Sequence, residues 1–286
     1  MPSSMSTISR ITMIMSDIFS FFSYAFVDRA LIAGFFTAAA CAALGMFLVL
    51  RKMSLIGDGL SHVSFGGIAI GLFLGAYPFA IAIPIAMLGS VLILRLSERA
   101  KLYGDAAIGV VSAIGIASGA LLASLSGGFN VDLFSYLFGN ILAIREGEVW
   151  LSVGLSAAVL AVLAALYWDL FAMTFDEEYA AVSGIRTEAI NTLLALLTAV
   201  TVVLSIKVVG VMLVSALLIL PPVAALQAGK RFSISLLLAV SFAAAAVFAG
   251  ILLSFFLDLP AGATIVMLLA LILAGAFWRQ RLARAR

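Results

Sequence analysis

The chain has 286 residues, of which 65% are hydrophobic and only 10% are charged, and its formal net charge is +2. Soluble domains are about 45–50% apolar and about 25% charged, so this composition excludes a soluble globular protein and a disordered one. The small net charge, without a basic block that carries interleaved aromatic residues, excludes nucleic acid as an expected partner. The sequence predicts an all-α, polytopic membrane protein, because its apolar segments are apolar on every face.

Nine apolar segments are candidates for membrane-spanning helices, each with about the 20 residues that a bilayer requires. They cover residues 30–50, 55–75, 77–96, 105–125, 148–168, 187–205, 208–227, 232–253 and 262–278. We expect eight to ten spans, because residues 187–227 form one run too long for a single helix. Lys207 and Gly210 supply the break in that run, which favours a tight hairpin near the membrane surface over a long bent helix.

The two ends of the chain are less apolar than its middle. Residues 1–29 are interpreted as an N-terminal leader, in which residues 11–26 form either an amphipathic helix in the membrane interface or a loosely ordered segment. Residues 30–278 are expected to form one transmembrane domain, and residues 279–286 a basic tail. No loop is long enough for a separate catalytic domain. The chain also lacks the G-x-x-x-x-G-K-[ST] motif that cradles ATP phosphates, so we do not expect it to bind ATP through a P-loop.

Basic residues predict the orientation, because cytoplasmic loops carry an excess of lysine and arginine. With the first loop placed in the cytoplasm, the 16 basic residues fall on that side except for Arg10, Arg29, Arg145 and Lys207. This distribution predicts an outside N-terminus and a cytoplasmic C-terminus. If residues 11–27 also cross the membrane, the N-terminus moves inside and the number of spans becomes ten.

One acidic residue lies inside a predicted span, and the only histidine of the chain follows it. Asp58 lies about one turn into the span at 55–75, and His62 comes four residues later. On a helix this spacing places both side chains on one face. A carboxylate and an imidazole together suit a borderline divalent metal such as zinc or manganese, and ionisable groups inside a membrane mark function by default.

Spacing alone leaves other roles open for this pair. Asp58 and His62 also suit a proton relay, or a buried hydrogen bond that fixes packing, and Asp58 suits a helix N-cap. Small residues around the pair predict a close approach of another helix backbone. These residues are Gly57, Gly59, Gly66 and Gly67.

Four stretches in chain order carry a family resemblance. They are LVLRKMSLIGDGLSH at residues 48–62, DAAIG at 105–109, DLFSYLFGNIL at 132–142 and VGVMLVSALLILPP at 209–222. They resemble the second-span signature, the opening of the fourth span, the external loop and the late span of the bacterial zinc/manganese-type ABC transporter permeases. The resemblance covers roughly residues 25–278. Two positions depart from the family pattern, Gly59, where alanine is commoner, and Phe65, in a run that usually holds smaller aliphatic residues.

The resemblance implies a transport subunit, not an enzyme, because ATP hydrolysis would reside on a separate chain. Residues 30–278 would form an importer-type permease bundle in the bacterial cytoplasmic (inner) membrane that works as a homodimer. It implies two further partners, a cytoplasmic ATP-binding subunit and an extracytoplasmic metal-binding protein. In this family Asp58 and His62 would handle the transported metal in the translocation path. The cargo would be Zn²⁺ or Mn²⁺, with no permanently bound cofactor.

The stretch 175–186 lies on the predicted cytoplasmic side. It predicts a short helix over residues 176–182, because acidic residues complement the positive end of a helix and Gly184 ends it. Composition alone favours a solvated connector. The stretch also resembles the acid-Ala-Ala-x-x-x-Gly coupling loop of importer permeases, which implies that it docks on the ATPase. The residues so implied are Glu177, Glu178, Ala180, Ala181 and Gly184.

Three further residues are candidates for the pathway or its gate. Ser61 adds a hydroxyl beside His62. Asp132 precedes an apolar and aromatic stretch that either caps the pathway, docks a binding protein, or forms a simple helix cap with an interfacial aromatic belt. Pro221, followed by another proline, predicts a bend or an end of the seventh span, with a gate hinge as a hypothesis. Asn191 is expected to form a hydrogen bond between helices.

The sequence favours the membrane subunit of an ATP-driven importer for zinc, manganese or iron, and it does not separate these metals. A proton-coupled secondary metal transporter is an alternative, in which Asp58 and His62 carry protons and no coupling loop is needed. An ABC permease for a chelate such as a siderophore is another, with a wide path that does not need His62. A structural or assembly protein would tolerate neutral substitutions of both residues.

Overall fold

The computed structural model describes residues 24–99, 103–125, 136, 137, 139, 144–229 and 231–284. Within these ranges the regular elements are helices, which confirms the predicted all-α class. The helices are α2 (Ala25–Leu50), α3 (Ile56–Phe73), α4 (Pro78–Arg99), α5 (Gly104–Leu125), α7 (Glu146–Ala165), α8 (Tyr167–Phe175), α9 (Glu177–Val182), α10 (Thr187–Val209), the short 3₁₀ helix η2 (Val211–Leu213), α11 (Val214–Ala228), α12 (Phe232–Leu257) and α13 (Ala261–Arg284).

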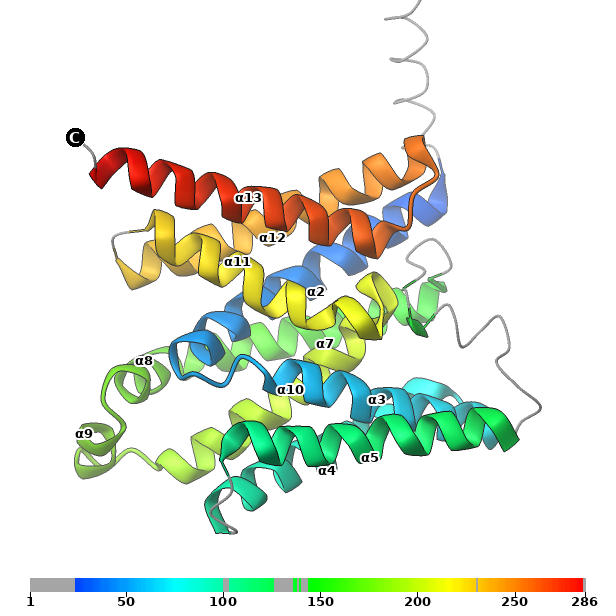
Figure 1. Cartoon of the computed structure of the whole chain (residues 1–286), viewed down its shortest axis with the longest axis horizontal. Helices are drawn as coiled ribbons and strands as arrows, with labels where there is room; N and C mark the ends of the chain where they lie inside the picture. Colours follow the sequence, from blue (N-terminus) through cyan, green and yellow to red (C-terminus); the bar gives the residue numbers. More distant parts are fainter. Residues whose placement is uncertain are drawn as a thin grey trace, which may run out of the picture.

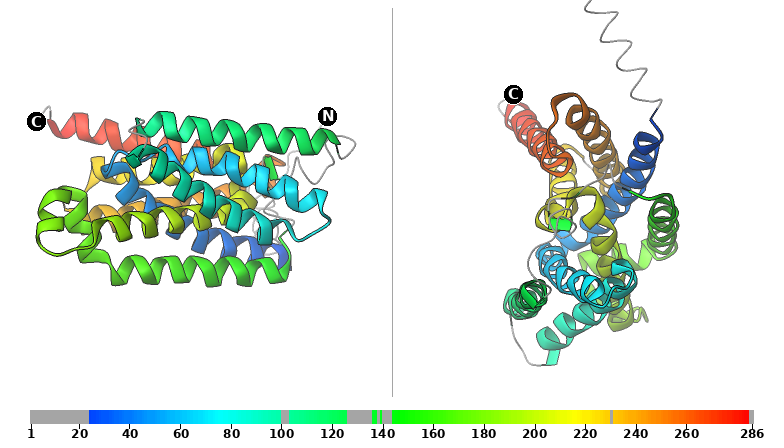
Figure 2. Two further views of the ribbon diagram at one scale, coloured as in Figure 1. Left: turned by 90° about the horizontal axis from the view of Figure 1, so that it is seen from below. Right: turned by 90° about the vertical axis from the view of Figure 1, so that its right-hand side faces the viewer.

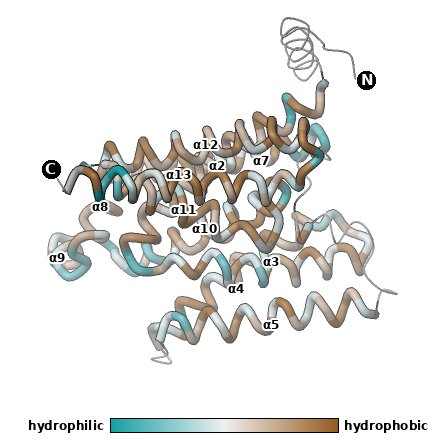
Figure 3. Tube along the Cα trace, turned by 45° about the horizontal axis from the view of Figure 1, so that its top comes forward, coloured by the Kyte–Doolittle hydropathy of each residue, from teal (hydrophilic) through white to brown (hydrophobic). Residues whose placement is uncertain are grey.

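The long helices run roughly side by side along the longest axis of the molecule (Figure 1, Figure 2). Helices α8 and α9 lie at one end together with the end of α13, and α2 begins at the other end. Figure 3 shows hydrophilic residues gathered toward the two ends, with apolar helix segments between them. Of the described helices, eight are long and apolar enough to cross a membrane. The arrangement is that of a polytopic membrane bundle, as predicted.

The eight crossing helices correspond to eight of the nine predicted spans. The other predicted span, 208–227, is the shorter apolar helix α11 with η2 before it. Helix α10 ends at Val209, and Gly210 has a φ of 85°, which a glycine adopts without steric cost. The chain then runs back as α11 (Figure 1). The predicted hairpin is therefore confirmed, and the alternative of one long bent helix is wrong.

The segment between the predicted span at 148–168 and the predicted short helix at 176–182 is also helical. Helix α8 begins directly after Leu166, which is both the C-cap of α7 and the N-cap of α8. Its aromatic side chains pack on Phe232 of α12, with ring centroids 5.9 Å apart for Tyr167 and 5.1 Å apart for Phe171. Aromatic residues four positions apart share a helix face, and this packing explains why the segment is helical.

Two boundaries also differ from the prediction. Helix α2 begins at Ala25, within the segment 1–29 that was interpreted as a leader. The amphipathic helix considered for residues 11–26 lies mostly outside the described residues. Helix α13 continues to Arg284, through most of the expected basic tail.

The two prolines of α11 do not end the helix. Of the bend and the end predicted at Pro221, the end is therefore wrong. Both lie inside α11, which continues to Ala228. Because proline has no amide hydrogen, Pro222 leaves the carbonyl of Leu218 without its usual helical donor. Gly45 of α2 packs directly on this carbonyl, where any side chain would collide.

Helix α3 packs most closely against α4 and α5. A Cβ atom added at Gly66 would lie 2.7 Å from the carbonyl oxygen of Gly115, and one added at Gly67 would lie 2.8 Å from the Cα atom of Ala82. The predicted close approach of neighbouring backbones is therefore confirmed at these two glycines. The unusual Phe65 packs its ring on Gly119 of α5, where the absence of a side chain makes room for it.

Candidate metal centre

The helix that carries Asp58 and His62 starts from a tight turn. Lys52 has a φ of 59°. The amides of Lys52 and Met53 donate hydrogen bonds of 3.1 and 2.8 Å to the carbonyls of Val49 and Leu48, which is the Schellman arrangement that ends a helix. The Ile56 amide then donates to the Met53 carbonyl at 3.1 Å. The turn therefore determines where the first turn of α3 lies.

Asp58 and His62 lie on one face of α3, as their spacing predicts. His62 Nε2 is 3.8 Å from Asp58 Oδ2, and 22% of the His62 side chain and 48% of the Asp58 side chain are exposed. Most of the other residues in the first two turns of α3 are buried. The pair therefore occupies an open position on a helix that is otherwise packed.

The distance between the two side chains fits a shared metal ion. At 3.8 Å they are too far apart for a direct hydrogen bond. Metal bonds of histidine nitrogen and carboxylate oxygen are about 2.0–2.2 Å, so one ion between Nε2 and Oδ2 would reach both atoms. In the part of the chain that the structure describes, no group of three or more His, Cys, Asp or Glu side chains could hold a metal ion. A metal ion held by Asp58 and His62 would therefore need further ligands from outside the described residues.

A residue that the sequence analysis did not single out also reaches this pair. Ser215, in the first turn of α11, donates a hydrogen bond of 3.4 Å to Asp58 Oδ1. Gly57 of α3 also packs on Leu218 of α11, so the first turns of the two helices meet beside Asp58. Ser215 belongs to the stretch 209–222 that resembles the family, and this resemblance could have pointed to Ser215 from the sequence.

Ser61 lies in the same turn but does not face open space. Its side chain is fully buried, and its hydroxyl donates to the carbonyl of Asp58 at 2.7 Å. The geometry therefore gives Ser61 a bond within α3 and does not direct it toward the metal ligands. His62 Nδ1 is buried and has no hydrogen-bond partner among the described residues.

The predicted coupling segment forms the helix α9 (Glu177–Val182). Asp176 is its N-cap and accepts a hydrogen bond of 2.9 Å from the amide of Tyr179. Gly184 has a φ of 89° and ends the segment, as predicted. Of the five residues that the family resemblance implies, Ala180 is buried and the other four, Glu177, Glu178, Ala181 and Gly184, are exposed.

Two pathway candidates have different outcomes. Asp132 lies outside the described residues. Pro221 is buried within α11, six residues beyond Ser215. Asn191 forms a hydrogen bond of 2.8 Å from its Nδ2 to Glu177 Oε1, so the expected bond between helices joins α10 to α9.

The end of the bundle opposite α9 carries a second polar cluster. Lys207 Nζ is 3.3 Å from Glu148 Oε1, and only 19% and 10% of their side chains are exposed. The same ammonium group lies 5.0 Å from the ring centroid of Tyr136 and 5.7 Å from that of Phe79. Burial, then the charge of Glu148 and a hydrogen bond to it, raises the pKa of Tyr77 to about 12, so this phenol stays neutral. The sequence alone predicts a helix break at Lys207 and a position for it outside the cytoplasm, but not its pairing with Glu148.

Comparisons with known proteins agree with this architecture. The ABC 3 transport family matches residues 23–280. The manganese transport system membrane protein MntC of Halalkalibacterium halodurans is 33% identical over 256 residues, which cover 90% of this chain and 88% of that protein. The manganese import system permease protein ScaB of Streptococcus gordonii is 32% identical over 253 residues, which cover 88% and 91%.

A solved structure shows the same fold. PsaBC from Streptococcus pneumoniae, in complex with Fab, has a TM-score of 0.84 and 30% sequence identity to this chain, with coverage of 92% of this chain and 95% of that one. The family match extends across nearly all of the described helices. The chain therefore belongs to the ABC 3 transport family, as the multi-span membrane subunit of a transport system.

Proposed function

We propose that this chain forms the translocation path of an ATP-driven importer for a divalent transition metal, with Mn²⁺ as its cargo. The observation that carries the proposal is the open Asp58 and His62 pair, spaced for one shared ion, inside a bundle of this family. The choice of Mn²⁺ over Zn²⁺ is supported by the manganese transport and import proteins among its relatives. Oxygen and imidazole ligands suit this ion.

The incomplete ligand set supports a homodimer of permeases. A tetrahedral zinc site needs four ligands and an octahedral site needs six, whereas the described residues of one chain offer Asp58 and His62. A second copy would contribute the same two side chains. Four protein ligands, with water in the remaining positions, would then hold Mn²⁺ weakly enough for release. The metal is the cargo, and no permanently bound cofactor is part of the proposal.

The coupling role of α9 is supported by its surface. Tyr179 and Val182 are 68% and 89% exposed, so this short helix presents apolar side chains that nothing in the described chain covers. Basic residues flank several helices at this end of the bundle, namely Arg51 after α2, Arg186 before α10 and Arg231 before α12. They support a cytoplasmic position for this end and for the C-terminus. We infer that α9 docks on a separate ATP-binding subunit, and that an extracytoplasmic metal-binding protein delivers the ion at the opposite end.

The test is the metal content of whole cells grown under metal starvation, measured by elemental analysis. Strains would carry the native chain, a deletion, Asp58→Asn or His62→Ala, with protein levels checked by immunoblot. Asp258→Asn is a matched control, because it makes the same change at an exposed position between α12 and α13. Asp258 has a φ of 51°, a conformation that asparagine also tolerates.

The proposal expects manganese to fall in the deletion and in both site variants, while Asp258→Asn stays at the native level. If the deletion lowers manganese but the site variants do not, the transport role stands and the assigned ligands are wrong. If zinc falls instead, the cargo is wrong. Deleting residues 177–181 addresses the proton-coupled alternative, which expects uptake to continue without them.

A further inference from the structure

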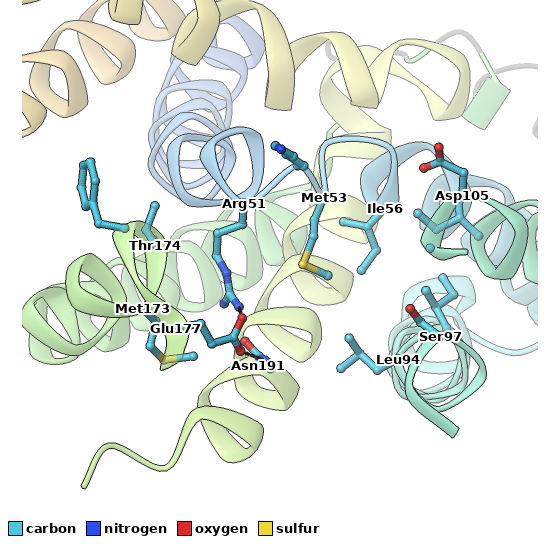
Figure 4. Close-up of a pocket in the computed structure, with 15 residues that line it drawn as sticks. Arg51, Met53, Ile56, Leu94, Ser97, Asp105, Met173, Thr174, Glu177 and Asn191 are labelled. Carbon is cyan, nitrogen blue, oxygen red and sulfur yellow. Dashed lines mark hydrogen bonds and ion pairs between the residues drawn. The ribbon is translucent and has the colours of Figure 1, made fainter. Parts of the chain in front are cut away.

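A buried arginine connects the helix α9 to the turn that leads to Asp58. Arg51 follows the last residue of α2, and only 7% of its side chain is exposed. Its Nη2 atom donates to Glu177 Oε2 at 3.1 Å. The other carboxylate oxygen of Glu177 accepts a hydrogen bond of 2.8 Å from Asn191 of α10. Both oxygens of the first residue of α9 are therefore held by the transmembrane bundle. Figure 4 shows Arg51, Glu177 and Asn191 meeting at this point.

Because the Arg51 side chain is buried, its charge depends on the contact with Glu177. A charge removed from water depends on its partner, and the loss of that partner leaves an uncompensated buried charge. The Nη1 atom of Arg51 and the Oδ1 atom of Asn191 are both buried and have no partner in the described residues. Glu177 is thus the counterion that the structure shows for this guanidinium group. Because 49% of the Glu177 side chain is exposed, the ion pair itself is a weak source of stability, so a role beyond stability is worth testing.

Backbone hydrogen bonds continue from Arg51 to α3, the helix that carries Asp58 and His62. The Schellman bonds of Lys52 and Met53 and the bond from Ile56 to Met53 leave no long unbonded segment between Arg51 and α3. Asp58 follows Arg51 by seven residues. A displacement of Glu177 would therefore move the turn and the first turn of α3 together.

The surroundings of the turn leave it room to move. A cavity of about 410 Å³ lies beside it, between the turn, the ends of α4 and α5, and the segment that joins α8 to α9. Its lining includes Arg51, Met53, Ser97, Asp105 and Glu177 (Figure 4). Close-packed interiors resist displacement, and an open volume of this size removes that resistance on one side of the turn.

We propose that Arg51 is the positioning residue through which movement of α9 reaches Asp58 and His62. The Arg51–Glu177 pair transmits the motion of the ATPase to the metal ligands, and its loss uncouples ATP hydrolysis from metal transport. This inference rests on the proposed function, because it assumes that α9 meets an ATPase and that Asp58 binds the cargo.

The experiment uses the transporter complex purified from its host through a tag on this chain and reconstituted into proteoliposomes. Mn²⁺ uptake and ATP hydrolysis are measured in the same preparation for Arg51→Met, Glu177→Ala and the charge exchange Arg51→Glu with Glu177→Arg. Glu188→Gln is the control, because Glu188 is an exposed acid at the start of α10 whose side chain forms no hydrogen bond or ion pair with the described residues.

Each single variant is expected to lower the Mn²⁺ transported per ATP at least tenfold. In Arg51→Met, which leaves the sequence of α9 unchanged, ATP hydrolysis is expected to stay within twofold of the native complex. The charge exchange is expected to restore at least a third of the native ratio, which a loss of general stability would not permit. Arg51→Lys keeps the charge and guards against a variant that does not fold. It is expected to hydrolyse ATP normally with an intermediate ratio.

The inference is overturned if the single variants keep the native ratio, or if hydrolysis falls in parallel with uptake in all of them, Arg51→Lys included. Asp58→Asn in the same assay separates this failure from that of the proposed function. If Asp58→Asn abolishes uptake while Glu177→Ala does not, the proposed function stands and only the coupling role of Arg51 fails. If Asp58→Asn leaves uptake at the native level, the proposed metal site itself is wrong.

Discussion

Lys207 Nζ lies 3.3 Å from Glu148 Oε1 at the end of the bundle opposite α9, and both side chains are largely buried. Glu148 also accepts a hydrogen bond of 3.0 Å from the amide of Arg145 and so completes the capping box at the start of α7. This one carboxylate therefore fixes the start of α7 and neutralises the last charged residue of α10.

The substitution Glu148→Gln is expected to destabilise the protein, because it leaves the Lys207 ammonium buried without a counterion. Glutamine still serves in a capping box, so the change isolates the charge. Breaking a buried pair costs roughly 3–5 kcal/mol, and the residual exposure of Lys207 favours the lower end. The thermal unfolding midpoint of the purified protein in detergent is expected to fall by roughly 5–10 °C.

The double variant Glu148→Gln with Lys207→Met tests the reason for that loss. Replacing both members of a buried pair with neutral side chains of similar size is often nearly neutral. The double variant should therefore recover at least half of the lost midpoint. A double variant as unstable as the single one would show that the charge of Lys207 is not the cause.

The close contact between α3 and α5 at the level of His62 gives a second prediction. A Cβ atom added at Gly115 would lie 2.6 Å from the Cα atom of Val63 and 2.8 Å from the carbonyl oxygen of His62. Gly115→Ala is therefore expected to cost about 1–3 kcal/mol and to lower Mn²⁺ uptake, because backbone atoms cannot turn aside.

Gly109→Ala is the matched control in the same helix. Nothing lies within 4 Å of a Cβ atom added at Gly109, and alanine is favoured over glycine in a helix by up to about 1 kcal/mol. Thermal unfolding of the two variants side by side should show a lower midpoint for Gly115→Ala and an unchanged or higher one for Gly109→Ala. Equal midpoints would contradict the packing described for α3.

The hydrogen bond from Ser215 to Asp58 predicts a modest role in metal binding. A net contribution of about 0.5–1 kcal/mol corresponds to a roughly twofold to fivefold change in affinity. Ser215→Ala is expected to raise the Kd for Mn²⁺ by that factor, measured from the paramagnetic resonance signal of the free ion. Ser241→Ala removes an exposed hydroxyl that bonds only within α12, so it should leave the Kd unchanged. An unchanged Kd in Ser215→Ala would remove this residue from the site.

The left-handed backbone of Lys52 predicts a stabilising substitution. This conformation costs a residue with a side chain roughly 1–2 kcal/mol of folding free energy, and it does not cost glycine this amount. Lys52→Gly is expected to raise the unfolding midpoint by roughly 2–4 °C. Lys52→Ala keeps the left-handed cost and serves as the comparison for the loss of the side chain. If both variants unfold at the same temperature, the turn is not strained.

The fold was predictable from the sequence because the membrane imposes a simple rule on it. Apolar segments of about 20 residues must be helical, since no water is available to bond their backbone. The break near Gly210 was also visible, because glycine follows a lysine in an apolar run. Helix α8 was not, since its stability comes from aromatic contacts with Phe232, which lies outside the segment.

The site was only partly predictable. The spacing of Asp58 and His62 places both on one helix face, and this could be read locally. The partners of such residues are distant in the chain, since Ser215 lies 157 positions from Asp58 and Glu177 lies 126 positions from Arg51. A single sequence contains no signal for such pairs. The burial of the Arg51 side chain was equally unpredictable, because an arginine after an apolar span usually lies in solvent.

The meeting of the first turns of α3 and α11 has an electrostatic consequence. A helix carries roughly half a positive elementary charge at its N-terminus, and two such ends converge on the Asp58 carboxylate. The same positive ends repel a cation that binds to this carboxylate. The attraction between Asp58 and a divalent ion is therefore partly offset by the peptide dipoles, which suits a position where the ion must pause and then leave.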